Sequence, residues 1–429
     1  MTRATGRRSA LRAAPVRHGR QKTSRPVLTA LRVVLTAIAV VAISATSLVA
    51  VAAWSTLASV KPGVHLAHLN ADPPPAVGEI DGEVNLLLAG SDTRTGQAGF
   101  QDKADLAGSS GTGNNDVTMV LHISADHSNA TVVSIPRDLL IPIPACPRPN
   151  GGTIGATSQA MFNTTLSRGG LACTVLTAES LTGLNIDYAA EISFDGVIGM
   201  SDAVGGVTVC IATPITDGYV GLDLPAGQQT LVGSQALAFV RSRHGIADGS
   251  DLGRISNQQV FLSALMRKIT SADVLSNPLT LYSLANSALQ NMQMSDTLTP
   301  PTTMVAIALA LKKISLSNIV FVQYPTKSNP AYPGRVVQEQ PEDNILKQAL
   351  MDDRPIQLTG QLGRAAVAAP AGTTPVAPSP TPTGPPAKAL GLGRTPPPDP
   401  TPTPTAAPVA LPSDVTGQVA SQETCTKGN

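Results

Sequence analysis

Charged side chains stand at the ends of the strands that the sequence predicts. Asp92 and Arg94 follow one apolar run, Asp116 directly precedes a second, and Arg137 and Asp138 follow a third. Guanidinium groups bind phosphate oxygens in pairs with fixed geometry, and aspartates hold Mg²⁺, which takes water and substrate phosphate oxygens as its other ligands. These residue types suit the binding of a diphosphate, with Asp92 and Asp116 as candidate ligands of Mg²⁺ or Mn²⁺.

A second group of polar side chains lies further along the chain. Arg241 and Arg243 are two residues apart, and Arg254 and Gln258 are four apart, so the latter pair shares one face of any helix that begins there. Two simpler interpretations remain open. In the first, each arginine would be an ordinary surface residue or half of a weak ion pair. In the second, Asp92 would only terminate a strand or form an Asx-turn.

Other signatures of catalysis or binding are missing from the sequence. No Walker loop, nucleophile elbow, dinucleotide fingerprint or zinc-protease motif is present. His122 and His244 have no obvious metal-ligand partners. Basic and acidic residues number 30 and 29, a balance that argues against a protein that coats nucleic acid through bulk charge.

Alternating apolar patterns predict the elements that must position these residues. Apolar runs rich in β-branched residues indicate buried strands, and the stretches between and after them have helical spacing. This alternation predicts an α/β or α+β layered domain over residues 84–360. The predicted strands are 84–89, 117–123, 131–135 and 319–324, and the predicted helices are 173–181, 196–204, 257–269, 279–292, 303–311 and 343–351.

The N-terminal part of the sequence predicts a membrane anchor. Residues 1–32 contain nine Arg or Lys and no Asp or Glu, and residues 33–54 are uncharged. A helix of that length crosses a hydrocarbon core of about 30 Å, and the cationic flank keeps its N-terminal end in the cytoplasm. Residues 55–83 predict a proline-containing stalk, with the rest of the chain extracytoplasmic. A cleaved secretory signal is the alternative, although the apolar core of a signal is shorter, at about 7–15 residues.

The C-terminal part of the sequence predicts an extended linker and a short tip. Residues 361–412 are rich in Ala, Pro and Thr, which is typical of a disordered, polyproline-like spacer. The tip, residues 413–429, contains Cys425. The other cysteines are Cys146, Cys173 and Cys210, and an even number beyond the anchor favours two disulfides. Three pairings are possible, and any bond of Cys425 would tie the tip to the domain.

Several sequence blocks in series resemble the LytR-CpsA-Psr family, and their order after a membrane anchor matches as well. The resemblance implies an α-β-α sandwich with a central mixed sheet, in which an apolar tunnel holds a polyprenyl chain with its pyrophosphate at the mouth. The blocks are N-L-L-L-A-G-S-D-T-R at 85–94, D-V-T-M-V-L-H at 116–122, S-I-P-R-D at 134–138, V-R-S-R at 240–243, and D-L-G-R followed by Q-Q within 251–259.

The resemblance also implies an activity and roles for these residues. Members of this family transfer glycopolymers from a polyprenyl-pyrophosphate carrier to peptidoglycan, outside the cell membrane. By position, Asp92 and Asp116 would hold Mg²⁺, and Asp92, Arg137 and Arg254 are the catalytic candidates. The residues expected to bind the diphosphate are Arg94, Arg137, Arg241, Arg243, Arg254 and Gln258.

Three departures from the family pattern remove cations that the resemblance leads us to expect. Asn114 and Asn115 replace an arginine and a serine, Met161 replaces a lysine, and Asn257 replaces an arginine. In comparable sites each lost donor costs about 2.7–4 kcal/mol of transition-state stabilisation. Net hydrolysis of the carrier and a non-catalytic scaffold that binds lipid carriers are therefore alternatives to transfer. A transcription regulator fits poorly, because a domain outside the membrane cannot reach DNA.

Overall fold

The computed structural model describes residues 62–66, 80–95, 97, 113–148, 151–270, 284, 287–370 and 407–429. The predicted basic tail and transmembrane segment, most of the stalk and residues 371–406 of the predicted linker lie outside these described residues. Within the described part of the chain, no helix combines the length and the apolar character needed to span a bilayer.

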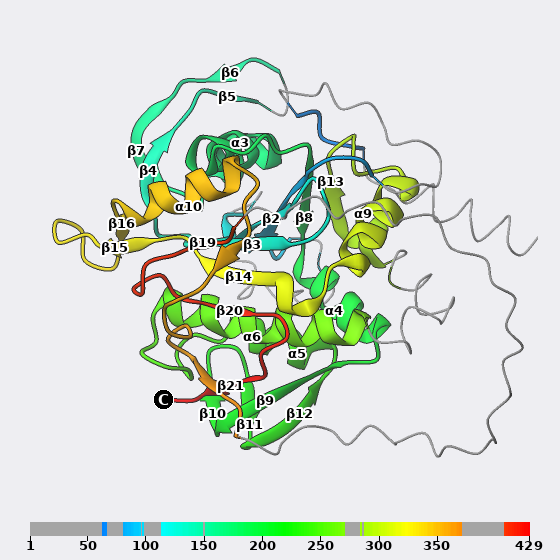
Figure 1. Ribbon diagram of the computed structural model, residues 1–429, viewed down its shortest axis with the longest axis vertical. Helices are drawn as coiled ribbons and strands as arrows, with labels where there is room; N and C mark the ends of the chain where they lie inside the picture. The colour runs from blue at the N-terminus through cyan, green and yellow to red at the C-terminus, as the bar shows by residue number, and fades with distance from the viewer. Residues whose placement is uncertain are drawn as a thin grey trace, which may run out of the picture. The chain divides into compact units, whose positions relative to one another are not determined.

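A seven-stranded mixed sheet forms the centre of the domain (Figure 1). Strand β1 pairs in parallel with β8, and β3 pairs in parallel with β14, while the other neighbours in the sheet are antiparallel. This confirms the mixed α/β fold. In spatial order the strands are β13 (Met292–Met294), β8 (Tyr188–Ile192), β1 (Val84–Ser91), β2 (Asn115–Ile123), β3 (Ala130–Ile135), β14 (Ile319–Gln323) and β20 (Gly417–Val419).

Helices cover both faces of this sheet (Figure 1). On one face, Leu87, Val120 and Val133 of the sheet join a buried cluster with Val175 of α3 and Leu346 of α10. A second cluster on the other face includes residues of α9 and partly buried side chains of α6. The helices are α3 (Thr164–Thr182), α4 (Phe194–Ala203), α5 (Gly233–Arg241), α6 (Asp251–Thr270), α9 (Pro301–Lys313) and α10 (Glu342–Met351), with the 3-10 turn η1 (Leu316–Asn318).

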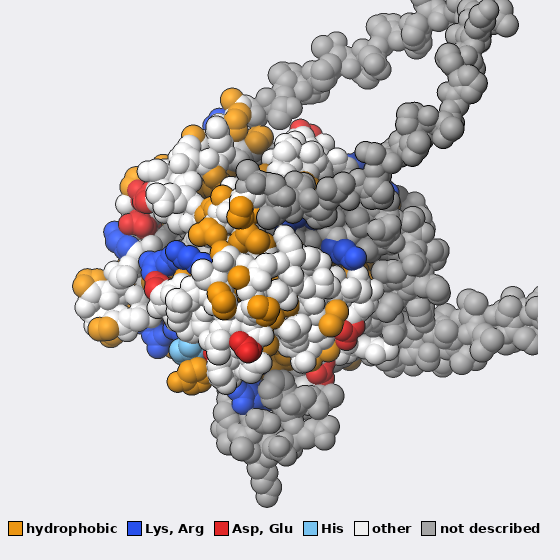
Figure 2. All heavy atoms as spheres, turned by 90° about the horizontal axis from the view of Figure 1, so that it is seen from below, with side chains coloured by type: hydrophobic (Ala, Val, Ile, Leu, Met, Phe, Trp, Pro, Cys, Tyr) orange, Lys and Arg blue, Asp and Glu red, His pale blue; other side chains and the backbone are white. Residues whose placement is uncertain are grey.

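A second, four-stranded sheet lies below α5 and α6 in Figure 1 and was not predicted from the sequence. Its apolar side packs against Phe239 of α5 and Phe261 of α6. Seen from below, this part of the molecule shows mainly uncharged polar and backbone surface, with charged side chains in small separate groups (Figure 2). The strand order is β12 (Gly227–Leu231), β9 (Val207–Thr213), β21 (Thr424–Lys427) and β18 (Ala366–Ala368).

The C-terminal residues are built into both sheets. The sequence analysis ended the domain at residue 360, yet β18 follows that point, and residues 407–429 supply β20 to the central sheet and β21 to the second. A disulfide joins Cys425 to Cys210, its direct partner in the parallel pair of β21 and β9. The C-terminal tip is therefore tied to the domain.

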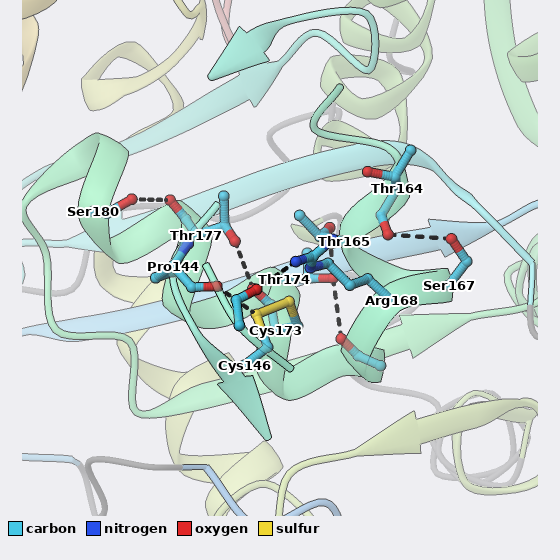
Figure 3. The surroundings of a disulfide bond; sticks show 12 residues. Pro144, Cys146, Thr164, Thr165, Ser167, Arg168, Cys173, Thr174, Thr177 and Ser180 are labelled. Carbon is cyan, nitrogen blue, oxygen red and sulfur yellow. Dashed lines mark hydrogen bonds between the residues drawn. A yellow bond between two sulfur atoms is a disulfide. The ribbon is translucent and has the colours of Figure 1, made fainter. Parts of the chain in front are cut away.

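The second disulfide, Cys146–Cys173, joins β5 to α3 (Figure 3). Helix α3 is interrupted at Gly169 and Gly170, which have non-helical backbone angles. A Cβ atom at Gly169 would lie 2.7 Å from Cys173 Cβ and 3.0 Å from Cys146 Cβ, closer than side chains approach each other. Glycine at this position therefore lets the chain pass close to the disulfide.

The remaining elements are short hairpins and bridges at the edges of the domain. Of the predicted helix 279–292, residues 287–291 are helical, and Met292 already begins β13. The minor strands are β4 (Leu140–Ile143), β5 (Cys146–Pro147), β6 (Thr153–Ile154), β7 (Thr157–Met161), β10 (Ile215–Asp217), β11 (Leu222–Leu224), β15 (Thr326–Ser328), β16 (Val336–Gln338), β17 (Ile356–Gln357) and β19 (Val409–Ala410).

Candidate active site

A cavity of about 410 Å³ lies between the central sheet and helices α4, α5 and α6. Helix α6 contributes one continuous stripe to its wall, polar at the N-terminal end and apolar beyond it. At 1.5 Å per residue this stripe is about 22 Å long, so the cavity combines a charged end with an elongated apolar part. The stripe consists of Arg254, Gln258, Phe261, Leu262, Leu265 and Ile269.

A β-bulge turns Asp116 towards this cavity. Gly90 of β1 pairs with Val117, but the next residue, Ser91, pairs with Asn115, so Asp116 is the extra residue of β2. In a regular strand Asp116 and Val117 would point to opposite faces, whereas both line the cavity. Bulges commonly re-aim a side chain next to an active site.

Arg137 and Arg254 converge on the carboxylate of Asp116. The Nη1 atom of Arg137 donates a hydrogen bond to Asp116 Oδ1 at 2.8 Å, and Arg254 Nη1 lies 3.7 Å from Asp116 Oδ2. A second carboxylate, Asp251, lies 2.7 Å from Arg254 Nη2 and 3.4 Å from Arg137 Nε. Three chain segments that are far apart in the sequence thus form one ion-pair network.

The acidic neighbours of Arg137 stabilise its charge. Burial alone would lower the pKa of Arg137, but the carboxylates of Asp116, Asp251 and Asp138 outweigh burial and raise it. The Nε atoms of Arg137 and Arg254 are buried and make no hydrogen bond to the described residues. The network is therefore held by charge attraction and leaves hydrogen-bond donors unused.

Arg241 experiences a different, more cationic environment. Burial lowers its pKa, and so do the charges of Arg94 and Arg254, although Asp116 and Asp92 partly oppose them. Its guanidinium carbon lies 4.2 Å from the ring centroid of Phe194, a cation–π contact at the start of α4. An anion bound at the charged end of the cavity would relieve this excess of positive charge.

The loop after Arg241 is held by a buried aspartate of β10. Asp217 Oδ2 accepts hydrogen bonds from the backbone amides of Arg243 at 2.9 Å, His244 at 3.0 Å and Gly245 at 3.2 Å, and from the Ser242 hydroxyl at 2.8 Å. Burial raises the pKa of Asp217, but these hydrogen bonds outweigh it and the pKa is lowered. Asp217 thereby fixes the backbone that carries Arg243.

Arg243, in the loop between α5 and α6, and Gln258 of α6 are positioned by hydrogen bonds to backbone carbonyls. Arg243 Nε donates to the carbonyl of Gly249 at 3.0 Å, and Gln258 Nε2 donates to the carbonyl of Val240 at 3.0 Å. Both side chains line the cavity. The predicted binding residues Arg94, Arg137, Arg241, Arg243, Arg254 and Gln258 are thus brought together at one cavity.

Of the two predicted magnesium ligands, Asp116 lines the cavity, whereas Asp92 is not among the lining residues. Asp92 Oδ1 accepts a hydrogen bond from the Asn114 amide at 2.5 Å, and the charges of Asp92 and Asp116 both act on Arg241. Magnesium is commonly held by one or two carboxylates together with water and substrate phosphates. Within the described ranges neither aspartate belongs to a group of three clustered ligand side chains, so substrate oxygens and water would have to complete the coordination.

The positions that depart from the family pattern have structural roles instead. The side-chain oxygen of Asn114 accepts a hydrogen bond from the Ser167 hydroxyl at 3.2 Å, and Asn115 Nδ2 donates to Thr118 Oγ1 at 2.6 Å within β2. Asn257 is fully buried, and its Nδ2 donates to the carbonyl of Phe239 at 2.6 Å. None of these three, nor Met161, lines the cavity.

Two residues at the cavity were missed from the sequence. Asp217 is the last residue of the short strand β10, in a sequence, Thr216-Asp217-Gly218, that carries no recognisable motif. Phe194 resembles any apolar residue at the start of a helix. Their importance follows only from contacts to Arg241 and to the loop after it. A carboxylate directly before a glycine-containing turn was the only available signal.

The fold and the site define an α/β domain whose cavity has arginines at one end and an apolar wall beyond them. Comparison with known proteins assigns this domain to a family. The chain belongs to the LytR-CpsA-Psr family, because the family model described as LytR_cpsA_psr matches residues 52–351.

Two relatives and one solved structure are similar to this chain. Cell wall biosynthesis protein LcpA of Corynebacterium glutamicum is 32% identical over 268 residues, 58% of this chain and 51% of the relative. Polyisoprenyl-teichoic acid–peptidoglycan teichoic acid transferase TagU of Oceanobacillus iheyensis is 32% identical over 189 residues, which are 44% of this chain and 52% of that relative. Protein gbs0355 from Streptococcus agalactiae shares the fold, with a TM-score of 0.50 at 21% identity, covering 63% of this chain and 88% of that one. The chain spans about half the length of the curated relatives.

Proposed function

We propose that this protein transfers a glycopolymer from a polyprenyl-pyrophosphate carrier to peptidoglycan, on the outer side of the cell membrane. The observation that carries the proposal is the two-part wall of the cavity. Helix α6 presents Arg254 and Gln258 at one end and an apolar stripe at the other. A lipid diphosphate has the same division into an anionic head and an apolar tail.

In this proposal the arginines bind the diphosphate and stabilise the charge that develops during transfer. A hydroxyl group of peptidoglycan forms a bond to the phosphorus that bears the glycan. The bond from that phosphorus to the bridging oxygen breaks, polyprenyl phosphate leaves, and the hydroxyl proton is released. Preorganised guanidinium groups can stabilise such charge without reorganising. Arg241, whose pKa is lowered by burial and by the charges of Arg94 and Arg254, would be stabilised by the bound anion.

Asp92 and Asp116 would hold a magnesium or manganese ion in this proposal. Such an ion supplies further neutralisation of the diphosphate charge when it is bound. Asp116 also orients Arg137 and Arg254 through the ion pairs described above. This second role of Asp116 does not depend on a metal.

The cellular setting is also part of the proposal. A charge-free segment at 33–54 after a basic tail would anchor the chain, with the catalytic domain outside the membrane. The relative TagU is named as a transferase that joins teichoic acid to peptidoglycan. Similarity to that relative supports the acceptor, and the polyprenyl carrier suits the apolar cavity.

The test is a transfer reaction with purified full-length protein, a polyprenyl-pyrophosphate-linked glycan, peptidoglycan and Mg²⁺. We expect a covalent glycan–peptidoglycan conjugate and stoichiometric polyprenyl phosphate. Cleavage of the pyrophosphate bond that proceeds equally well without peptidoglycan would identify a hydrolase. Tight binding of the lipid without any turnover, in Mg²⁺ or Mn²⁺, would identify a non-catalytic binder.

A further inference from the structure

A buried histidine lies at the far end of β2 from the candidate active site. His122 is only 2% exposed, and it lies six positions further along the strand than Asp116. At about 3.3 Å per residue, the two positions are about 20 Å apart. His122 therefore belongs to a separate cluster, formed with Glu83 before β1 and Asp353 after α10.

The neighbours of His122 determine which of its ring nitrogens carries a proton. Asn85 Nδ2 donates to the carbonyl of Asn185 at 2.9 Å, which orients the amide and leaves Asn85 Oδ1 as an acceptor. His122 Nδ1 lies 2.8 Å from that oxygen and must therefore donate to it. In the neutral ring Nε2 then has a lone pair and no proton.

This lone pair points at a carboxylate. Nε2 of His122 lies 3.0 Å from Asp353 Oδ1, and both atoms are electron-pair donors when the ring is neutral. The other oxygen, Asp353 Oδ2, accepts the amide of Ala125 at 2.9 Å. Two lone pairs at this distance need either a proton or a metal cation between or beside them.

The cluster carries more negative than positive charge. Ligand atoms of Glu83, His122 and Asp353 all lie within 4.8 Å of one another. Asp187 is close by: burial first, and then the charge of Glu83, raise its pKa. A proton on His122 would neutralise only one of these carboxylates, whereas a divalent cation would neutralise two.

We propose that Glu83, His122 and Asp353 form a binding site for a divalent transition metal of the zinc type. One imidazole nitrogen and two carboxylate oxygens suit such an ion, and water can fill the remaining positions. Ligand distances of about 2.0–2.2 Å and a tetrahedral angle at the metal place the nitrogen and an oxygen about 3.4 Å apart, so the 3.0 Å between His122 Nε2 and Asp353 Oδ1 would widen slightly when the metal binds. The hydrogen bond from Nδ1 to Asn85 supplies the support that metal-binding histidines usually have.

Metal binding at this site would connect three distant segments of the chain. Glu83 precedes β1, His122 lies near the end of β2, and Asp353 follows α10, at a sequence separation of 231 from the histidine. Asp353 has a positive φ of 52°, a conformation that Asp and Asn tolerate better than other side chains with a Cβ. The site would hold α10 and its loop against the central sheet.

Zinc titration of the metal-free full-length protein tests this proposal. We expect saturable one-to-one binding by calorimetry and a rise in Tm. Binding should persist in Asp116→Asn, which removes the candidate magnesium ligand at the other end of β2. Asp353→Asn keeps the left-handed backbone and the acceptor for Ala125 but loses the charge, and it should weaken binding by at least the roughly 10–100-fold that loss of an outer-shell partner costs.

Controls distinguish this cluster from other sites. Glu83→Gln, at an exposed position, should also weaken zinc binding, while Asp352→Asn, the neighbouring acid outside the cluster, should not. Co²⁺ substitution should give absorption bands that disappear in His122→Gln. The proposal is overturned if zinc does not bind one to one, or if binding is unchanged in both Asp353→Asn and Glu83→Gln. A proton shared by His122 and Asp353 would then account for their contact.

Discussion

The hydroxyl of Thr426 donates a buried hydrogen bond to Oδ1 of Asn257, at 2.8 Å. Thr426 belongs to β21 at the C-terminus, and Asn257 lies in α6 one residue before Gln258 of the candidate site. The side-chain nitrogen of Asn257, Nδ2, donates a hydrogen bond to the carbonyl of Phe239 in α5. The C-terminal strand thus supports the two helices that carry the cavity arginines.

Replacing Thr426 by valine should destabilise the fold more than it affects chemistry. The change leaves Asn257 Oδ1 buried without this donor, which costs about 1–3 kcal/mol. Urea denaturation should show this loss, while kcat of the folded protein stays near the wild-type value. The matched control is Thr208→Val, because the hydroxyl contact of Thr208 with Thr230 is exposed. Equal stability of the two variants would contradict this prediction.

The sequence predicted the central sheet better than the second one. Strands β1, β2, β3 and β14 are continuous apolar runs, and each lies within two residues of its predicted bounds. The second sheet depends on a parallel pair between β9 and β21, whose cysteines are 215 residues apart. Local sequence patterns contain no information on such a pairing. Strand β21 also follows residues 361–412, whose composition predicts a linker.

The sequence indicated which residue types form the candidate site, but not how these residues are arranged in space. The residue types of Arg137, Arg241 and Arg254 indicated an anionic ligand, and the structure brings them to one cavity. The bulge at Asp116 could not be predicted, because it depends on the register with β1. Asn257 looked like a lost phosphate ligand, but successive helix residues point about 100° apart, and its side chain faces β21 rather than the cavity.

Asp217→Asn should impair substrate binding through the arginine loop. Asparagine keeps one acceptor oxygen for the loop amides, among them that of Arg243, but it loses the negative charge, and its amide nitrogen cannot accept the Tyr219 amide that Asp217 Oδ1 receives. Hydrogen bonds to a charged group contribute about 1.5–3 kcal/mol each. We expect KM for the lipid-linked donor to rise about tenfold, for which about 1.4 kcal/mol suffices, with a smaller change in kcat. Asp223→Asn, in the exposed neighbouring strand β11, is the control.

The pH dependence of the unfolding free energy gives an independent measure of how much the charged Asp217 carboxylate stabilises the fold. Its folded-state pKa is lowered, so its contribution to stability is present above the unfolded-state pKa of about 3.9 and is lost as the pH falls through the folded value. Unfolding free energies of the wild type and Asp217→Asn should therefore differ most at neutral pH and converge in acid. A difference that does not change between pH 7 and pH 2 would refute this assignment.

Asp116→Asn should abolish most of the transferase activity. It removes the charge that pairs with Arg137 and Arg254 and one of the two candidate metal ligands. Loss of a group that organises transition-state stabilisation typically lowers kcat about 10²–10³-fold. Initial rates of conjugate formation measure this effect. Asp126→Asn, in the exposed turn beyond the other end of β2, should retain wild-type rates; similar rates for both variants would argue against the site.

Removing the disulfides should affect stability unequally. The Cys210–Cys425 bond closes 215 residues and Cys146–Cys173 closes 27. In the chain-entropy description these loops correspond to about 5 and about 3.5 kcal/mol of stabilisation. Double Cys→Ser variants compared by urea denaturation should preserve this order. A larger loss from the Cys146–Cys173 pair would show that native-state contacts, rather than loop closure, dominate.

Filling the apolar part of the cavity should separate lipid recognition from diphosphate recognition. Leu262 lies on the cavity-facing stripe of α6, beyond Gln258. Leu262→Trp would occupy the space proposed for the polyprenyl chain, so transfer from a long-chain donor should fall at least about tenfold. A donor with a short prenyl chain binds mainly through its head group and should lose much less.

Overpacking by Leu262→Trp itself costs about 1–3 kcal/mol of stability, so Tm must be measured alongside the transfer rates. Leu309→Trp on the exposed side of α9 adds the same volume outside the cavity. If both donors are affected equally by Leu262→Trp while the fold is retained, the apolar part of the cavity does not hold the lipid.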